Sequence, residues 1–225
     1  MKQLQKQLFV LVMGLLATLA ITSVNAETFR EGVDYTELKQ PIQTADPSTI
    51  EVREFFWFGC PHCFKLESFA HAFAKDLPDG VVFLQTPAPL NKSWMNHAHA
   101  FYVMEALGKT DVMAPALFNQ LHVAKNKIFS QEQLATFFGK YDVSTSDFNK
   151  LFQSFSVRTK VRQAEAFARA ARLNGVPAMV VNGKYVVGTR QAKGFPRMMQ
   201  IVNFLIEKEK VIAQASAEGR AAGKG

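Results

Sequence analysis

Residues 50–66 read IEVREFFWFGCPHCFKL, and this stretch decides the fold. Its first part, Ile50–Phe58, is apolar and aromatic enough to form a strand buried in the centre of a sheet. Gly59 then permits a sharp turn, and Pro61 suits the first turn of a helix, where a missing N–H costs nothing. The pattern predicts a central strand that leads directly into a helix beginning at the two cysteines.

The rest of the chain alternates between strand and helix signals. Further strands are predicted at Val81–Leu84, Ala178–Val181 and Tyr185–Val187, the last two joined by the hairpin signal Asn182-Gly183. Helix starts are expected near Ser93, Ser130 and Ser144, and a further helix over residues 111–124. A break is expected near Ser154–Ser156 in the helical pattern that runs toward Leu173. A final amphipathic helix is expected over Pro196–Ile212, with Met199, Val202, Leu205 and Ile206 facing inward. The predicted class is α/β, in the order of a thioredoxin-like fold with an inserted α-helical domain.

This order predicts the domain boundaries. The thioredoxin-like domain would comprise residues 27–90 and 156–212, and the inserted helical domain residues 91–155. The segment 213–225 is small, polar and glycine-rich, which predicts a disordered tail.

Residues 1–26 have the parts of a secretory signal peptide. Lys2 and Lys6 precede the apolar run Leu8–Ile21, and small residues stand before a cleavage site after Ala26. The run is shorter than the roughly 20 residues that span a membrane, although an uncleaved anchor is the alternative. The sequence therefore predicts an exported protein.

The net charge is modestly basic. Removing the signal peptide, which holds two lysines and no acid, lowers the formal charge from +7 to +5. The basic residues are scattered rather than clustered, which indicates a solvated surface rather than a nucleic-acid partner.

The chain has only two cysteines, Cys60 and Cys63. A structural disulfide normally closes a longer loop, because the entropic gain grows with loop length. A zinc site would need about four ligands, and His97 and His99 do not face one another in a helix. Like His71 and His122, they are interpreted as surface or packing histidines, so no metal or other cofactor is expected and the cysteine pair is assigned to redox chemistry.

The surroundings of Cys60 favour its thiolate. At a helix N-terminus, free N–H groups and the helix dipole stabilise negative charge, and His62 can add a positive charge or a hydrogen bond. The pKa of Cys60 is therefore expected below the free value of about 8.5. A stabilised thiolate makes the Cys60–Cys63 disulfide a stronger oxidant and Cys60 a good leaving group.

Two further positions carry open alternatives. Strand alternation sends Glu54 inward with apolar residues, where it is either a functional buried acid or, at a bulge or sheet edge, a solvated one. The Val176-Pro177 bond, taken from the residues alone, is expected to be trans, because cis bonds are about 5% of X–Pro bonds in folded proteins.

Two motifs resemble the DsbA family of bacterial disulfide oxidases. They are EFFWFGCPHC at residues 54–63 and GVPAMVVNGKY at residues 175–185, and the similarity continues over most of the mature chain. The resemblance implies that Cys60 is the exposed nucleophile, that Cys63 is the buried resolving cysteine, and that Val176-Pro177 is cis and packs against the disulfide. Glu54 matches the family's buried acid.

The resemblance also implies a setting and partners. These are a periplasmic location, reduced exported proteins as substrates, and a DsbB-like, quinone-linked membrane protein as reoxidant. We expect the protein to be a monomer. One departure is visible: Gln85 stands where well-known members carry a lysine that pairs with the buried acid, which leaves the charge state of Glu54 open.

Two other functions compete with the oxidase. A disulfide isomerase of the dimeric type carries an N-terminal dimerisation domain, for which residues 27–49 are too few, and a tethered reductase would keep its anchor. A periplasmic peptide-binding chaperone with incidental cysteines would show no cysteine-dependent activity.

Overall fold

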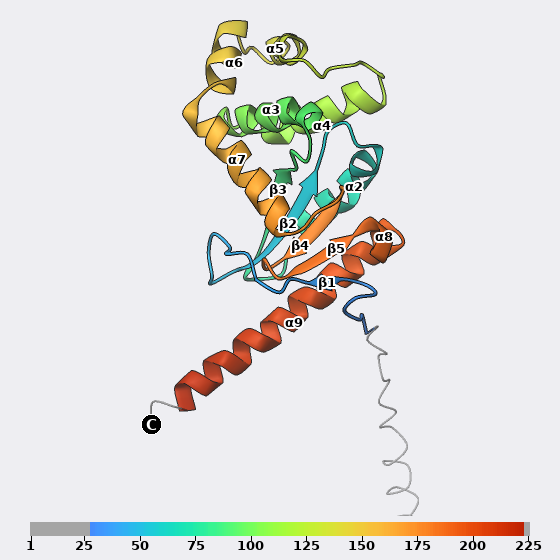
Figure 1. The fold of residues 1–225 in the computed structure, drawn as a ribbon, viewed down its shortest axis with the longest axis vertical. Coiled ribbons are helices and arrows are strands. Elements are labelled where there is room, and N and C mark those ends of the chain that lie inside the picture. The colour runs from blue at the N-terminus through green and yellow to red at the C-terminus, as the bar shows by residue number, and fades with distance from the viewer. Residues whose placement is uncertain (1–27, 223–225) are drawn as a thin grey trace, which may run out of the picture.

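A computed structural model describes residues 28–222, which form a five-stranded sheet with helices on both faces (Figure 1). The strand order is β1-β5-β4-β2-β3, where only β2 and β3 are parallel. The strands are β1 (Thr36–Glu37), β2 (Ile50–Phe56), β3 (Val81–Pro87), β4 (Ala178–Val181) and β5 (Tyr185–Gly188). The predicted central strand is therefore β2, which lies between β4 and β3.

Each face of the sheet packs against different helices. Val52 shares a core with residues of α2 (Pro61–Lys75) and α9 (Phe195–Ala222), whereas Phe55 packs with residues of α7 (Phe155–Ala170) on the other face. The short helix α8 (Thr189–Ala192) connects β5 to α9. This arrangement confirms the α/β class that the sequence predicts.

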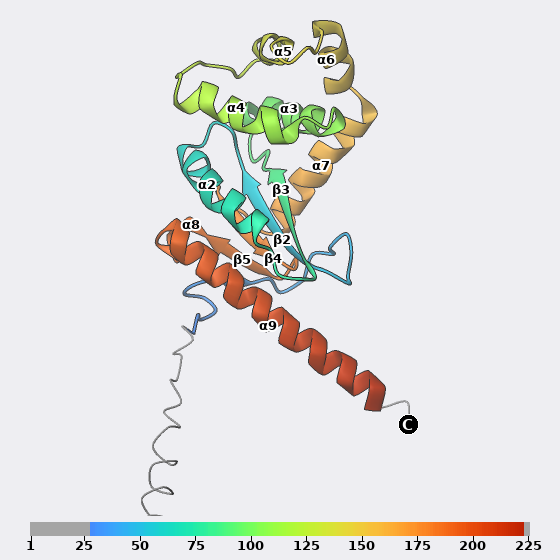
Figure 2. The same cartoon turned by 180° about the vertical axis from the view of Figure 1, so that it is seen from behind.

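A layer of helices lies between β3 and α7 in the chain and covers one end of the sheet (Figure 2). It comprises the 3-10 turn η1 (Lys92–Trp94), α3 (Met95–Ala106), α4 (Thr110–His122), α5 (Gln131–Gly139) and α6 (Thr145–Phe152). Their buried aromatic side chains form one core with Phe56 and Phe58, so the helical layer is packed directly onto the end of β2.

The helix starts follow the serine signals except at one position. Ser130, Ser144 and Ser154 cap α5, α6 and α7 by accepting a backbone N–H, and Ser130 completes the predicted capping box with Gln133. The expected cap at Ser93 is wrong, because its hydroxyl donates to Asn91 Oδ1 at 2.6 Å within a 3-10 turn and α3 begins two residues later.

The end of α9 also differs from the prediction. The sequence predicts disorder over residues 213–225, but the helix continues to Ala222 and projects from the body of the molecule (Figures 1 and 2). Alanine, glutamine, glutamate and arginine favour helix, and extending a helix that is already packed avoids the cost of nucleation. The predicted signal peptide, residues 1–26, lies outside the described residues.

No helix within residues 28–222 combines the length and the apolar character that a membrane crossing requires.

A buried carboxylate fastens α9 to the β4–β5 hairpin. Glu209 is 3% exposed and accepts hydrogen bonds from Lys184 Nζ at 2.6 Å, Tyr185 Oη at 3.0 Å and the side-chain amide of Asn182. Burial raises the pKa of Glu209, but these bonds outweigh burial and lower it. The hydrophobic pattern of α9 gave no sign of this contact.

Glu209→Ala is expected to lower the free energy of unfolding by about 2–4 kcal/mol. It leaves the partly buried Lys184 and the buried Tyr185 hydroxyl without the carboxylate to which they donate. Glu207→Ala is the control, since Glu207 is 66% exposed and forms a surface pair with Lys210 worth less than about 1 kcal/mol. Urea unfolding measures both; equal losses in the two variants would contradict the role given to Glu209.

Candidate redox site

Cys60 occupies the N-cap of α2, as the sequence predicts. Its backbone is extended, with φ −88° and ψ 117°, and its Sγ accepts the backbone N–H of Cys63 at 3.4 Å. Pro61 takes the first helical position, where it removes no needed donor. The thiol of Cys60 therefore faces the free N–H groups at the start of the helix.

Both cysteines are free thiols here, and both are largely buried. Cys60 is 8% exposed and Cys63 is fully buried, so the implied exposure of Cys60 holds only in comparison with Cys63. Cys63, in the first turn of α2, faces the core, whereas Cys60 lies at the end of the helix as its cap. Of the two, only Cys60 retains exposed surface.

The two thiols have opposite pKa shifts. A hydrogen bond from the Cys63 thiol, the backbone N–H groups of Cys63 and His62, and the charge of His62 together overcome burial and lower the pKa of Cys60 to about 6. Burial, above all, raises the pKa of Cys63 well above its ordinary value. At neutral pH the pair thus holds one thiolate, on Cys60, and one thiol, on Cys63.

The loop before β4 closes the other side of Cys60. The Val176-Pro177 bond is cis, so the trans bond expected from the residues alone is wrong and the cis isomer implied by the resemblance is confirmed. The carbonyl oxygen of Val176 lies 3.6 Å from Cys60 Sγ and accepts a hydrogen bond from this sulfur when it is protonated. Residues 116 positions apart in the sequence therefore meet at one sulfur atom.

Glu54 is buried, only 1% exposed, and lies directly opposite Gln85 in the β2–β3 register. Since β2 is an interior strand, the solvated alternative is wrong. Gln85 Nε2 donates to Glu54 Oε2 at 2.9 Å, but an amide brings no charge. Burial raises the pKa of Glu54 to about 8, and the nearby Glu67 adds to this.

Glu67 is a second acid near the site, which the sequence patterns above did not single out. Its Oε1 accepts a hydrogen bond from His71 Nε2 at 2.9 Å, while its Oε2 is buried and finds no partner among the described residues. Burial raises the pKa of Glu67. The spacing could have revealed it, because Glu67 follows Cys63 by four residues and so shares its helix face.

Two tryptophans stack where the chain leaves β2 and turns toward Cys60. The rings of Trp57 and Trp94 stack with centroids 4.4 Å apart. A Cβ atom on Gly59 would lie 2.3 Å from the ring of Trp57, so the glycine makes room for this ring. From the sequence, Gly59 is expected only to permit a sharp turn.

Histidines of the helical layer support the strand that carries the site. His122 Nε2 lies 2.7 Å from the carbonyl oxygen of Phe58, and its ring stacks on Phe64 of α2. His97 is 1% exposed, bonds the carbonyl oxygen of Ile128, and has its pKa lowered to about 4 by burial. Both are packing histidines. Within residues 28–222, no group of three or more His, Cys, Asp or Glu side chains is arranged to hold a metal ion.

Known proteins share this sequence and fold. A family profile described as the DSBA-like thioredoxin domain matches residues 79–200. The thiol:disulfide interchange protein DsbA of Azotobacter vinelandii is 35% identical over 188 residues, which cover 84% of this chain and 88% of that protein. Its namesake from Pseudomonas aeruginosa is 32% identical over 209 residues, covering 93% and 99%.

Solved structures agree with the sequence comparisons. The crystal structure of Pseudomonas aeruginosa DsbA superposes with a TM-score of 0.79 at 33% identity, covering 83% of this chain and 97% of that one. DsbA from Xylella fastidiosa gives a TM-score of 0.77 at 28% identity, covering 82% of this chain and all of that one. The chain belongs to the DsbA family of thiol:disulfide interchange proteins and is a thiol:disulfide oxidoreductase with a thioredoxin-like fold.

Proposed function

We propose that Cys60 is the reacting cysteine and that Cys63 is the resolving cysteine. The observation that carries this assignment is the contrast between the two thiols: the pKa of Cys60 is lowered to about 6, whereas that of Cys63 is raised. The thiolate with the lower pKa is the better leaving group in thiol–disulfide exchange. Pro61 and His62, which lie between the two cysteines, are the first two residues of α2.

The reaction starts from the Cys60–Cys63 disulfide. A substrate thiolate attacks Cys60 Sγ, forming a mixed disulfide and releasing the sulfur of Cys63, which takes up a proton because its pKa is high. A second substrate thiolate then attacks the substrate's sulfur in the mixed disulfide and releases Cys60 as a thiolate. The substrate dithiol loses two electrons, which the two cysteines of the protein gain.

Val176 and Glu54 support this exchange. The carbonyl oxygen of Val176, held beside Cys60 by the Val176-Pro177 loop, is placed to accept the backbone N–H of a bound peptide once the sulfur is in a disulfide. Glu54 lies on the strand behind the cysteines and contributes to the raised pKa of Cys63. We assign it the proton that the departing Cys63 requires.

The substrates are reduced exported proteins, and the site of action is the periplasm. The signal peptide at residues 1–26 directs the export and is then cleaved off. A DsbB-like, quinone-linked membrane protein restores the disulfide, and the protein acts as a monomer without nucleic acid or metal. We divide the chain as the sequence predicts, into a thioredoxin-like domain of residues 27–90 and 156–212 and an inserted helical domain of residues 91–155.

Stoichiometric oxidation of a reduced, unfolded protein tests the function. The disulfide form should transfer its disulfide to the substrate within seconds, and glutathione titration should show an equilibrium on the oxidising side of glutathione. A chaperone would bind the unfolded protein but leave its thiols unchanged, and an isomerase or reductase would hold its own cysteines reduced in the same titration.

His62→Ser is expected to raise the pKa of Cys60 and make the protein a weaker oxidant. The change should be partial, because the charge of His62 contributes least to the lowered pKa and the backbone N–H groups remain. Glutathione equilibrium and the thiolate absorbance at 240 nm measure it. Lys65→Ser, which removes an exposed charge two residues beyond the motif, should change both less; equal effects would contradict a specific role for His62.

A further inference from the structure

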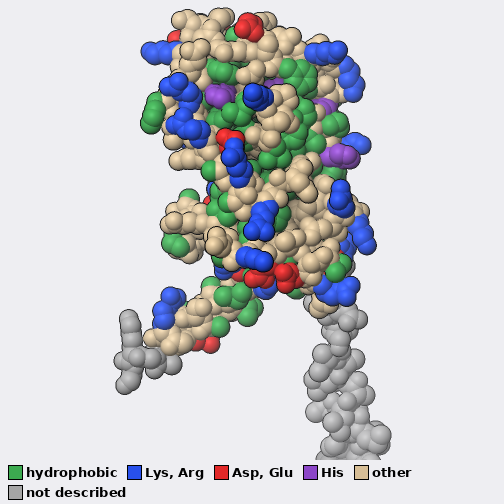
Figure 3. Space-filling view, viewed as in Figure 1, with side chains coloured by type: hydrophobic (Ala, Val, Ile, Leu, Met, Phe, Trp, Pro, Cys, Tyr) green, Lys and Arg blue, Asp and Glu red, His purple; other side chains and the backbone are tan. Residues whose placement is uncertain are grey.

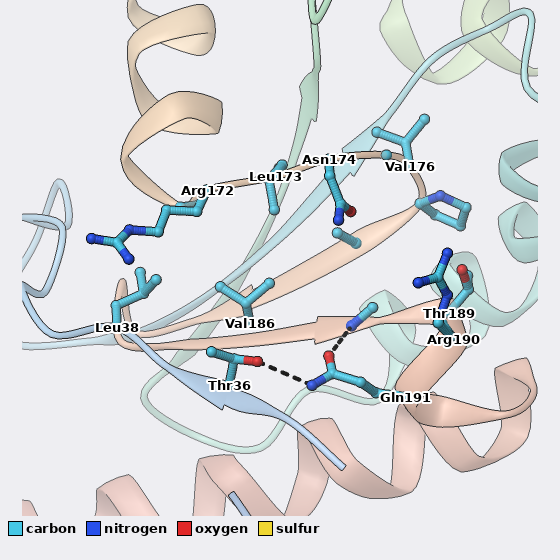
Figure 4. A pocket seen from close by; sticks show the side chains of 15 residues that line it. Thr36, Leu38, Arg172, Leu173, Asn174, Val176, Val186, Thr189, Arg190 and Gln191 are labelled. Atoms are coloured by element: carbon cyan, nitrogen blue, oxygen red, sulfur yellow. Dashed lines mark hydrogen bonds between the residues drawn. The ribbon is translucent and has the colours of Figure 1, made fainter. Parts of the chain in front are cut away.

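A pocket lies on the face of the sheet that α7 covers, and it begins at the loop that touches Cys60. Its volume is about 560 Å³, and it is lined by β1, by β5 with α8, and by the segment from Ala171 to Ala178. Leu38, Leu173 and Val186 give it apolar walls (Figure 4). The apolar surface continues from Val176, whose carbonyl oxygen is 3.6 Å from Cys60 Sγ.

The backbone along this pocket is available for pairing. Within residues 28–222, no hydrogen bond engages the backbone N–H groups of Asn174, Gly175 and Val176, because the ladder of β4 begins only at Ala178. The side chain of Gln191, by contrast, is occupied, since it bonds Thr36 Oγ1 and the backbone N–H of Gly188 (Figure 4). An extended peptide can therefore form hydrogen bonds with the backbone of residues 174–176, whereas the Gln191 side chain has little bonding capacity left for it.

The charge of the pocket has one sign. Arg172 and Arg190 both line it, both are exposed, and neither forms an ion pair with any residue of the described chain. In Figure 4, Arg172 lies beside Leu38 and Arg190 lies with Thr189 toward the end where Val176 is found. No aspartate or glutamate is among the described residues that line the pocket.

Neighbouring acids do not cancel this charge. The acid next in sequence to the lining residues is Glu37, whose carboxylate is 3.6 Å from Lys208 Nζ. Glu165 on α7 is paired with Arg169. On the face shown in Figure 3, acidic side chains are few among many lysines and arginines.

We propose that this pocket binds the stretch of substrate polypeptide that flanks the reacting cysteine, and that Arg172 and Arg190 select substrates with acidic residues in that stretch. The proposal rests on the function assigned to Cys60 and adds a substrate preference to it. A peptide that pairs with Val176 beside Cys60 continues along Gly175 and Asn174, where its side chains come within reach of the two guanidinium groups. Carboxylates match guanidinium geometry through paired hydrogen bonds.

Two dithiol peptides test the proposal. They are identical except that the two positions on each side of the first cysteine are Glu in one and Gln in the other. Stopped-flow reduction of the protein's disulfide gives kcat/KM for each peptide with the wild type, with the double variant Arg172→Gln/Arg190→Gln, and with Arg158→Gln. Arg158 is an exposed arginine of α7 outside the pocket, so this control removes one positive charge and leaves the pocket lining unchanged.

The wild type is expected to oxidise the Glu peptide about tenfold faster than the Gln peptide, through KM, as two exposed charge pairs allow. The double variant should lose this preference without a change in its glutathione equilibrium, and Arg158→Gln should keep most of the preference. Raising the salt to about 1 M should also reduce the preference, because exposed charges are screened.

Equal rates for the two peptides with the wild type would overturn the proposal, as would an undiminished preference in the double variant. An equal loss in Arg158→Gln would show a general effect of net charge and overturn it too. So would loss of binding to anionic vesicles in the double variant without any change in peptide preference, which would assign the arginines to a membrane surface. Failure of the wild type to oxidise either peptide would instead overturn the proposed function itself.

Discussion

Cys60→Ser should abolish disulfide transfer, leaving only the uncatalysed background, because it removes the sulfur that substrate thiolates attack. In Cys63→Ala, mixed disulfides should accumulate with proteins that already contain disulfides. The Cys60 thiolate attacks a substrate disulfide and releases one substrate sulfur as a thiolate, and no second thiol of the protein can then displace the bound substrate. Non-reducing electrophoresis measures both results, with a reduced substrate protein for Cys60→Ser and a disulfide-containing substrate protein for Cys63→Ala. Cys63→Ala/Cys60→Ser is the matched control and should form no adduct.

The pH dependence of alkylation adds a quantitative test of the same assignment. Iodoacetamide should modify Cys60 of the reduced protein with a midpoint near pH 6, the value to which its pKa is lowered. In Cys63→Ala the midpoint should rise, because the hydrogen bond from the Cys63 thiol is the largest contribution to that lowering. Faster alkylation of Cys63 than of Cys60 in the wild type would reverse the two roles.

The parts of the site that the sequence predicted are those set by local rules. The N-cap place of Cys60 follows from a turn before Pro61, and the inward direction of Glu54 follows from strand alternation. The family resemblance also placed Gln85 beside Glu54 correctly, since the parallel register of β2 with β3 sets the two residues opposite one another. In each case a neighbour in sequence or one adjacent strand decides the position.

The parts that it could not predict depend on contacts between distant segments. The cis bond before Pro177 is a minority state that tertiary packing selects, so X–Pro frequencies favoured the wrong isomer. The bond from His122 to the Phe58 carbonyl depends on how the helical layer sits on the sheet, and no pattern within α4 encodes it. The helical end of α9 does not depend on distant contacts. The small, polar composition of residues 213–225 suggested disorder, whereas the helix propensity of these residues favours helix.

Glu54→Gln should stabilise the protein, and the gain should grow with pH. The folded pKa of Glu54, about 8, is raised above its ordinary value of 4.5, so the folded state binds the proton more tightly than the unfolded state. The stability that this proton contributes is complete below pH 4.5 and is lost as the pH rises through 8. Glutamine keeps the shape and a hydrogen bond to Gln85 but does not titrate.

The size of the gain follows from the difference between the folded and the ordinary pKa of Glu54. Each pKa unit corresponds to about 1.4 kcal/mol, so the variant should gain less than about 1 kcal/mol at about pH 5 and at most about 4 kcal/mol at about pH 8. Urea unfolding of the reduced proteins at the two pH values measures the difference. Glu105→Gln, at a half-exposed position of α3, should show no such growth with pH.

The same substitution should slow the exchange reaction. The sulfur of Cys63 leaves as a poorly stabilised thiolate, and its raised pKa makes a proton donor on the strand behind it valuable. With glutamine in place of this acid, reduction of the disulfide by a dithiol should be slower near neutral pH and depend less on pH between about 7 and 9. Gln85→Lys should lower the pKa of Glu54 by supplying the positive charge that an amide lacks, and so move the wild-type profile toward acid. A profile that stays fixed in both variants, together with an unchanged stability, would show that Glu54 has no part in the proton transfer.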